Sequence, residues 1–342
     1  MSKPELSRRD FLKLSGYSLI GMTLPASSLA PQQDEFSNLQ GRIIDRIVWS
    51  YEAPDIKSPR KNLYWHDLVI PISNTTTGVD EAAHNRIWYE VEDGSYVYSG
   101  AVQPVRTTLN RPQPISIKGA LGEVSVPFTD ARLEADSQSD VVYRLYYETV
   151  HWVKASAIHP LDESMWYCLL DDKLDQFYYV PAEHIRLIPD LELAPLSEHV
   201  PSQDKHIEVR LDEQVVLAYE RETLVFATRT STGGRRRSGT YITPIGDFIT
   251  FHKRPTRHMA AGDIASNGFD LPGVPWVLYI THSGISFHGT YWHNDFGRPR
   301  SHGCINLTPQ AAKWLYRWTI PTVAPEKELA YGHMGTKVQI KV

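Results

Sequence analysis

The chain carries, near its C-terminal end, the segment Phe287-His-Gly-Thr-Tyr-Trp-His-Asn-Asp-Phe-Gly-Arg-Pro-Arg-Ser-His-Gly-Cys-Ile-Asn306. A cysteine thiol attacks a carbonyl only as the thiolate, so its ordinary pKa of about 8.5 has to fall through a neighbouring imidazole or a helix N-terminus. Both are expected beside Cys304, because His302 lies close to it in sequence and Thr308 is predicted to cap a helix. The segment therefore predicts an activated cysteine nucleophile.

A general base and an oxyanion site can be drawn from the same segment. His288 ends a predicted strand, and the loop that follows can bring its imidazole back onto the thiol. Gly303 allows a tight backbone that would aim the amide groups of Gly303 and Cys304 at a developing oxyanion. The alternative is a zinc site of His288, His293, His302 and Cys304. We expect no metal, because the Cys-x-x-Cys or His-x3-His spacing that usually seeds such a site is missing.

The sequence on both sides of this segment predicts strands and one helix. Runs rich in β-branched residues predict strands at 206–211, 214–219, 223–228, 247–251, 276–280 and 337–342. A helix capped by Thr308 and stopped by Pro321 is predicted, because the capping residue and Pro309 precede apolar residues at helical spacing. This part of the chain is therefore predicted to be a mainly β domain whose principal helix follows Cys304 directly.

The pattern of His288 followed by Ser301-His-Gly-Cys-Ile-Asn306 resembles the catalytic motif of the L,D-transpeptidase (YkuD) family, which are cysteine acyltransferases of bacterial peptidoglycan. The resemblance covers residues 204–342. Ser231-Thr-Gly233 and Thr243-Pro-Ile-Gly-Asp-Phe248 resemble the strand-and-turn signature of the family, and Arg257-His-Met259 resembles part of its substrate-covering loop. The fold that this resemblance implies is a YkuD-type β-sandwich.

The resemblance also implies a role for individual residues. Cys304 would be the nucleophile and His288 the base, oriented by the carbonyl of Gly289, while His302 supports the loop. Substrate contacts are expected from Met259, His282, Trp292, Ser301 and Asn306. Several relatives carry Tyr-Ser-Gly where this chain has His282-Ser-Gly284, so His282 is expected to alter donor recognition or the pKa of the thiol. His293 and His252 are interpreted as surface or structural residues.

The reaction implied by the resemblance needs no metal and no other cofactor. Cys304 would attack the carbonyl of the third residue of a donor stem tetrapeptide, release D-Ala, and pass the acyl group to an amine of an acceptor stem. Hydrolysis of the same thioester would make the protein an L,D-carboxypeptidase. A non-catalytic wall-binding protein is the alternative from a different class. Carbapenem-type β-lactams are the expected inhibitors.

The half of the chain that precedes this domain is also predicted to be β, in two similar copies. Ile87-Trp-Tyr-Glu-Val91 and Met165-Trp-Tyr-Cys-Leu169 each lead through a charged turn into an aromatic strand, which predicts two hairpins. They resemble bacterial SH3-type wall-associated domains, over residues 42–110 and, more clearly, over 122–189. Their aromatic residues are interpreted as core, with a glycan or peptide platform as the alternative. Residues 190–203 are predicted to be a linker.

The composition limits the possible partners. The 35 basic and 40 acidic side chains give a formal charge of −5, which does not predict attraction to nucleic acid. The chain has two cysteines, so no disulfide scaffold is expected. Cys168, between a tyrosine and a leucine on a predicted strand, is interpreted as a buried inert thiol.

The first residues resemble a twin-arginine export signal. Ser7-Arg-Arg-Asp-Phe-Leu-Lys13 precedes a short apolar run and the small residues of Ala26-Ser-Ser-Leu-Ala30, so residues 1–35 are predicted to be a signal peptide and leader. The expected location is the cell envelope, at the periplasmic or extracellular face. Pro31 directly after Ala30 is a poor context for cleavage, which leaves a retained membrane anchor as the alternative. The fold class predicted for the whole chain is mainly β, with two small SH3-like barrels before the YkuD-type sandwich.

Overall fold

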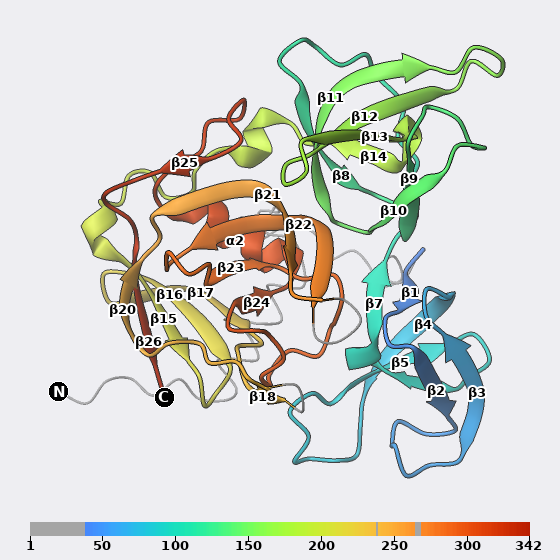
Figure 1. The fold of residues 1–342 in the computed structure, drawn as a ribbon. Coiled ribbons are helices and arrows are strands. Elements are labelled where there is room, and N and C mark those ends of the chain that lie inside the picture. The colour runs from blue at the N-terminus through green and yellow to red at the C-terminus, as the bar shows by residue number, and fades with distance from the viewer. Residues whose placement is uncertain (1–37, 237–238, 264–267) are drawn as a thin grey trace, which may run out of the picture.

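The computed structural model describes residues 38–236, 239–263 and 268–342. The predicted fold class is confirmed, because the described elements are mostly strands and the one described α-helix is α2 (Pro309–Trp318). Figure 1 shows three β units, two coloured blue and green and a third coloured yellow to red. The predicted signal peptide, residues 1–35, lies outside the described residues.

The first β unit is a seven-stranded sheet with the strand order β3-β2-β6-β5-β4-β1-β7. Its strands are β1 (Gln40–Ile43), β2 (Ile47–Tyr51), β3 (Arg60–Trp65), β4 (Val69–Thr77), β5 (Ile87–Val91), β6 (Tyr96–Tyr98) and β7 (Val102–Val105). The alternating pattern of these strands buries Ile43, Ile72 and Val97 in one core.

The second β unit has the same strand order, β10-β9-β13-β12-β11-β8-β14. Its strands are β8 (Ala120–Val124), β9 (Phe128–Arg132), β10 (Val141–Tyr146), β11 (Val150–Ile158), β12 (Met165–Asp171), β13 (Gln176–Pro181) and β14 (Ile185–Leu187). Trp88 and Trp166, one in each unit, are both buried, so neither presents its ring to solvent as a platform. The likeness of these units to SH3-type domains stays a prediction.

The C-terminal unit contains two five-stranded sheets and the helix. The first sheet has the order β17-β16-β15-β26-β20, from β15 (Lys205–Arg210), β16 (Val215–Glu220), β17 (Thr223–Arg229), β20 (Gly246–Ile249) and β26 (Lys337–Lys341). The second has the order β24-β23-β22-β21-β25, from β21 (His252–Ala261), β22 (Phe269–Tyr279), β23 (Ser286–Gly289), β24 (Ile305–Leu307) and β25 (Ala330–Tyr331). Two short strands, β18 (Arg235–Arg236) and β19 (Gly239–Thr240), pair with each other.

Helix α2 packs into the core of the C-terminal unit, as predicted from its apolar spacing. The Thr308 hydroxyl accepts a hydrogen bond from the Ala311 amide, and Pro309 occupies the first turn. Its last carbonyls are bound by two buried lysines: Lys253 donates to Tyr316 and Thr319, and Lys205 donates to Trp318. Burial lowers the pKa of Lys253 to about 7.

Residues 190–203, predicted to be a linker, pack along α2. Arg317 of the helix donates to the Ala194 carbonyl at 2.8 Å, and Lys313 forms an ion pair with Glu192 at 2.7 Å. Leu193 is buried in the same core as the helix. The segment is therefore fixed to the C-terminal unit by an apolar anchor and two polar contacts.

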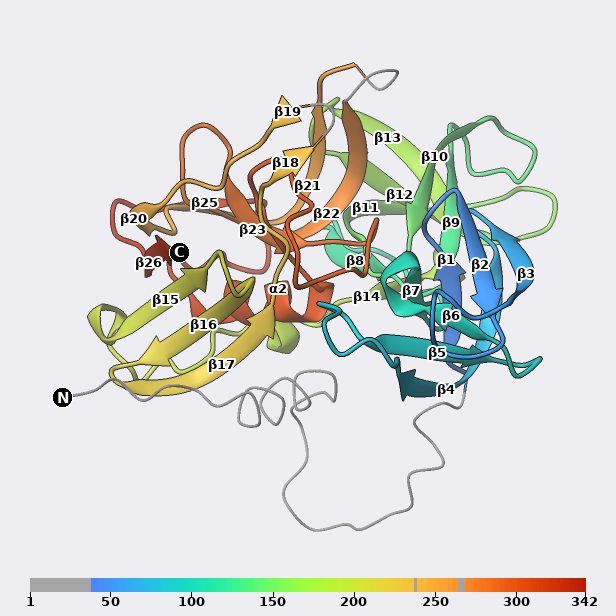
Figure 2. The ribbon, with the colours of Figure 1, turned by 90° about the horizontal axis from the view of Figure 1, so that it is seen from below.

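The stretch Arg257-His-Met259, predicted to lie in a substrate-covering loop, is part of a strand, and that prediction was wrong. It belongs to β21, which pairs antiparallel with β22 over most of its length. Arg257 and Met259 pair with β22, and the His258 amide donates to the Asp172 carboxylate at 2.6 Å, so the segment has no need of a loop conformation. Figure 2 shows this long hairpin beside β11 of the second unit.

Candidate active site

The candidate site is built on two neighbouring parallel strands, β23 and β24. Their register places Phe287 beside Ile305 and His288 beside Asn306. Because side chains alternate along a strand, Phe287, Ile305 and Leu307 share the face that packs into the buried core. Ser286 and His288 on β23 must share the opposite face with Cys304 and Asn306. The sheet therefore brings the predicted nucleophile and the predicted base to one side.

The thiol of Cys304 lies at the edge of this face and is half-buried. Its hydrogen-bond partners are the Ser286 hydroxyl, 3.7 Å from the sulfur, and the Gly284 carbonyl, which accepts at 3.7 Å. Burial raises the pKa of the Cys304 thiol, although hydrogen bonds from Ser286 act in the opposite direction. The expectation of a lowered thiol pKa in the resting protein is therefore wrong, because desolvation outweighs the nearby dipoles.

The imidazole of His288 is neutral and oriented in this structure. It is 2 % exposed, and its Nδ1 donates a hydrogen bond to the Gly289 carbonyl at 3.1 Å. Because a carbonyl can only accept, Nδ1 carries the proton and Nε2 keeps a lone pair. Burial lowers the pKa of His288 to about 4. The site at rest thus holds a protonated thiol and a neutral base.

Gly303 has the strained turn predicted for it but uses its amide differently. Its φ of +116° suits glycine, and a Cβ there would come within 2.7 Å of Ile285 Cδ1. The Gly303 amide donates to the Ser301 hydroxyl at 3.0 Å, and that hydroxyl donates to the Cys304 carbonyl at 2.5 Å. The prediction that the Gly303 amide faces an oxyanion was therefore wrong: the amide closes the turn. The same role for the Cys304 amide stays a prediction.

The two stretches predicted as a strand-and-turn signature lie directly against this turn. Ser231 forms an isolated bridge with Asn306, and Gly233 forms one with Ser301. The Thr243 hydroxyl accepts from the Gly233 amide at 2.8 Å and donates to the Gly303 carbonyl at 2.7 Å. These contacts fix the backbone on which Cys304 sits.

Matches to known proteins agree with this geometry. A family model described as the L,D-transpeptidase catalytic domain (YkuD) matches residues 204–340. Residues 204–340 thus match a YkuD catalytic domain. The match spans the unit that carries Cys304 and His288 and does not extend into the two preceding β units. A search of curated proteins found no match to the chain.

Solved structures of L,D-transpeptidases share a limited likeness with the chain. A mutant of the Enterococcus faecium enzyme is 22 % identical over 40 % of this chain and 50 % of its own, with a TM-score of 0.31. The Xylanimonas cellulosilytica enzyme is 25 % identical over 40 % of this chain and 60 % of its own, with a TM-score of 0.28. L,D-transpeptidase 3 from Mycobacterium tuberculosis is 16 % identical over 55 % of this chain and 78 % of its own, with a TM-score of 0.32. The chain thus spans 50 % and 60 % of the first two proteins.

Other predicted site residues belong to the same C-terminal unit. The Trp292 ring lies against His288 with centroids 5.6 Å apart, so it forms a wall beside the base. The His302 ring meets the edge of Tyr241 at 4.3 Å. Met259 packs with Trp292 in a small apolar cluster around Tyr291. Asn306 is 2 % exposed, and its side-chain amide donates to His293 at 2.9 Å.

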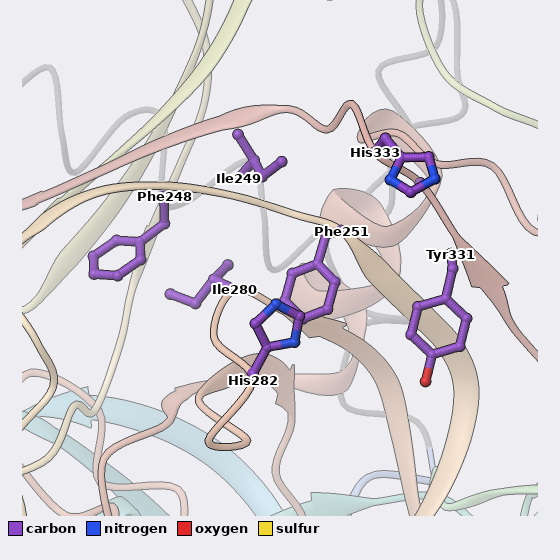
Figure 3. Close-up of a pocket in the computed structure, with 8 residues that line it drawn as sticks. Phe248, Ile249, Phe251, Ile280, His282, Tyr331 and His333 are labelled. Atoms are coloured by element: carbon purple, nitrogen blue, oxygen red, sulfur yellow. The ribbon is translucent and has the colours of Figure 1, made fainter.

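His282 does not place its ring at the thiol. The ring packs on Phe251 with centroids 4.5 Å apart and lines a neighbouring cavity of about 510 Å³. Figure 3 shows this cavity, whose other labelled residues are Phe248, Ile249, Ile280, Tyr331 and His333. The Gly284 carbonyl, at the end of the same turn, is the group that meets the sulfur. No contact of the His282 ring therefore supports the expected effect of this residue on the pKa of the thiol.

One residue at the site was missed from the sequence, and His293, interpreted as a surface or structural residue, has a structural role. Ser286 contacts the thiol, and a signal for it existed, because it stands two positions before His288 on a predicted strand and so shares its face. His293 is 4 % exposed and holds Asn306, which no local pattern could indicate. Among the described residues, no group of three or more His, Cys, Asp or Glu is arranged to hold a metal. No described helix is long and apolar enough to cross a membrane.

Proposed function

We propose that this protein is a peptidoglycan L,D-transpeptidase that cross-links stem peptides through a thioester on Cys304. The observation that carries the proposal is the shared face of β23 and β24, on which both Cys304 and an oriented neutral His288 lie. The match of residues 204–340 to the L,D-transpeptidase catalytic domain supports the same chemistry. Trp292 and the turn that ends at Gly284 bound the space on either side of the reacting groups.

In the first half-reaction, the donor stem tetrapeptide acylates the enzyme. Nε2 of His288 takes the Cys304 proton as the sulfur bonds to the carbonyl carbon of the third stem residue. The tetrahedral intermediate collapses when the C–N bond to the terminal D-Ala breaks, and the imidazolium gives its proton to that leaving amine. In the resting site the pKa of the thiol is raised and the imidazole is neutral, so we propose that the proton moves from Cys304 to His288 only after substrate binds.

In the second half-reaction, an amine of an acceptor stem attacks the thioester carbonyl. His288 accepts the amine proton and returns it to the sulfur as the C–S bond breaks, which restores the resting pair. Water in place of the amine would give the L,D-carboxypeptidase product. The buried surroundings of His288 favour the acceptor amine, because bulk water is kept from the base.

Inhibition and location belong to the same proposal. A carbapenem presents a strained amide that the thiol can open to a stable acyl-enzyme. A solved structure of the E. faecium catalytic domain is described as acylated by ertapenem. Because peptidoglycan lies outside the cytoplasmic membrane, we propose that residues 1–35 export the protein by the twin-arginine pathway.

The test is incubation of the full mature chain with tetrapeptide-bearing muropeptides, followed by mass analysis of the products. A cross-linked dimer that has lost one D-Ala is the expected product, with none formed by Cys304→Ala. Hydrolysed tripeptide in place of the dimer would indicate the carboxypeptidase. Unchanged substrate that nevertheless co-sediments with the protein would indicate a wall-binding protein instead.

A further inference from the structure

The loop between β23 and Ser301 makes contacts on two sides, with the candidate active site and with the first β unit. Trp292 and His293 face the site, where they contact His288 and Asn306. Their neighbours Tyr291, Asn294 and Asp295 are instead bound by the first β unit. The loop is thus held from behind by a separate part of the chain while it presents two side chains to the reacting groups.

The first hold on the loop is a buried arginine. Arg42 of β1 is 1 % exposed and donates to the Tyr291 carbonyl at 2.8 Å. The guanidinium of Arg42 also donates to the Gln103 side chain, and it forms an ion pair with Asp67 at 2.9 Å. A buried guanidinium needs all of these partners, so its position is closely defined.

The second hold is a pair of polar side chains on the loop. The Asn294 amide reaches the Val102 carbonyl at 3.1 Å and the Ser99 carbonyl at 3.3 Å. The carboxylate of Asp295 is fully buried and contacts His84 Nε2 at 2.7 Å, while the Tyr98 hydroxyl donates to it at 2.8 Å. Its other oxygen is bound by arginines of its own loop, Arg298 and Arg300.

We propose that the first β unit is a positioning domain of the active site, in which His84 and Tyr98 hold Asp295 so that Trp292 and His293 stay against His288 and Asn306. The expected effect on acylation rests on the proposed function, whereas the placement of Trp292 and His293 does not depend on it. Misplacing a group beside the reacting atoms by about 1 Å can cost on the order of 100-fold in rate. Loss of this hold should therefore slow acylation without removing any residue that touches substrate.

The variant that tests the hold is the double substitution His84→Ala with Tyr98→Phe in the full chain. His84 is 30 % exposed and Tyr98 is half-buried, so the core of the first unit remains intact. The matched control is His184→Ala with Tyr167→Phe in the second unit. The His184 ring contacts Thr129 of its own unit, and the Tyr167 hydroxyl contacts Gln113 in the segment that precedes the first strand of that unit. His84→Gln keeps a side-chain donor that can reach Asp295 and serves as the rescue.

Two measurements are made on each variant. One is the rate of carbapenem acylation at saturating inhibitor, where we expect a 10- to 100-fold loss in the double variant only, with His84→Gln within about threefold of wild type. The other is the ¹⁵N spectrum of the His288 and His293 imidazoles, which reports the loop whether or not the protein acylates. We expect both signals to shift in the double variant and to stay unchanged in the control.

The outcomes separate the two proposals. Unchanged imidazole signals in the double variant would overturn the positioning role, and so would an equal loss of rate in the control. Shifted signals in the double variant alone support it, even if no variant is acylated. A wild-type protein that never reacts with a carbapenem, while its signals behave as expected, would count against the proposed function and leave the positioning role standing.

Discussion

The Ser286 hydroxyl lies 3.7 Å from the Cys304 sulfur, on the neighbouring strand of a parallel pair and on the same face. The Ser286 hydroxyl opposes the rise in thiol pKa that burial causes, whereas the Gly284 carbonyl accepts from the protonated thiol. Ser286 is therefore a residue that stabilises the thiolate as it forms.

Ser286→Ala should raise the pKa of Cys304 beyond its already raised value. One hydrogen bond to the sulfur is worth about 1 kcal/mol, so alkylation by iodoacetamide should slow about fivefold at neutral pH. The pH profile of that alkylation should move to higher pH. Ser283→Ala, in the exposed turn nearby, is the control and should leave the profile in place. An unshifted profile in Ser286→Ala would show that the hydroxyl does not act on the thiolate.

The low pKa of His288 sets the acid limit of the reaction. Because burial lowers this pKa to about 4, the imidazole stays neutral and able to accept a proton at every pH above that value. The rate of carbapenem acylation should therefore fall only as the pH approaches about 4, well below the 6.5 of an exposed histidine. His288→Ala should lose on the order of 10²- to 10⁴-fold at neutral pH. An acid limb near pH 6.5 would argue against His288 as the base.

A second histidine links the long β21–β22 hairpin to the second β unit. His258 is buried, with Nδ1 2.6 Å from Asp171 and Nε2 against Asp270, while Tyr143 and His151 lie close by. Burial alone would lower the pKa of His258, but the hydrogen bonds with the two carboxylates outweigh it and raise the pKa. The hairpin is thus held to the second unit by a charged imidazole.

This raised pKa predicts a loss of stability on the alkaline side. The contribution of His258 is fully present below the unfolded pKa of 6.5 and is lost as the pH rises through the higher folded value. Between pH 6 and pH 9 the melting temperature of the wild type should therefore fall further than that of His258→Gln, which lacks a group that titrates in this range. Thermal unfolding curves at several pH values provide the comparison. Parallel curves for the two proteins would exclude the charged form.

The export prediction is independent of the enzyme's chemistry. Arg8→Lys with Arg9→Lys removes the feature that selects the twin-arginine pathway, so the precursor should remain in the cytoplasm. Cell fractionation with immunoblotting measures this. Unchanged secretion of the double variant would refute the assignment of residues 1–35.

The parts of the molecule that follow from local sequence were predictable. The strands on both sides of Cys304 and the helix capped by Thr308 follow from residue periodicity and capping, which are properties of neighbouring residues. The face shared by His288 and Cys304 depends on strand register, and Ser286 was missed although the same register determines it.

The features of the site that could not be predicted from the sequence depend on desolvation and on contacts between residues that are distant in the chain. Cys304 has the neighbours that lower a thiol pKa, yet burial raises it, and burial is a property of the whole fold. His84 and Asp295 are far apart in the chain, so no local pattern indicates that one holds the other. The turn at Gly303 was expected from its glycine, but the hydrogen bond from the Gly303 amide to the Ser301 hydroxyl depends on how the folded loop places that side chain.

The proposed function requires a covalent intermediate at Cys304. The most direct test is intact mass spectrometry of the full chain after incubation with a carbapenem, followed by peptide mapping. We predict one adduct per chain, on Cys304 and absent from Cys168, whose pKa burial also raises but which lies away from His288. The adduct should disappear in Cys304→Ala. An adduct that persists in Cys304→Ala, or a wild-type protein that forms none, would contradict the proposed nucleophile.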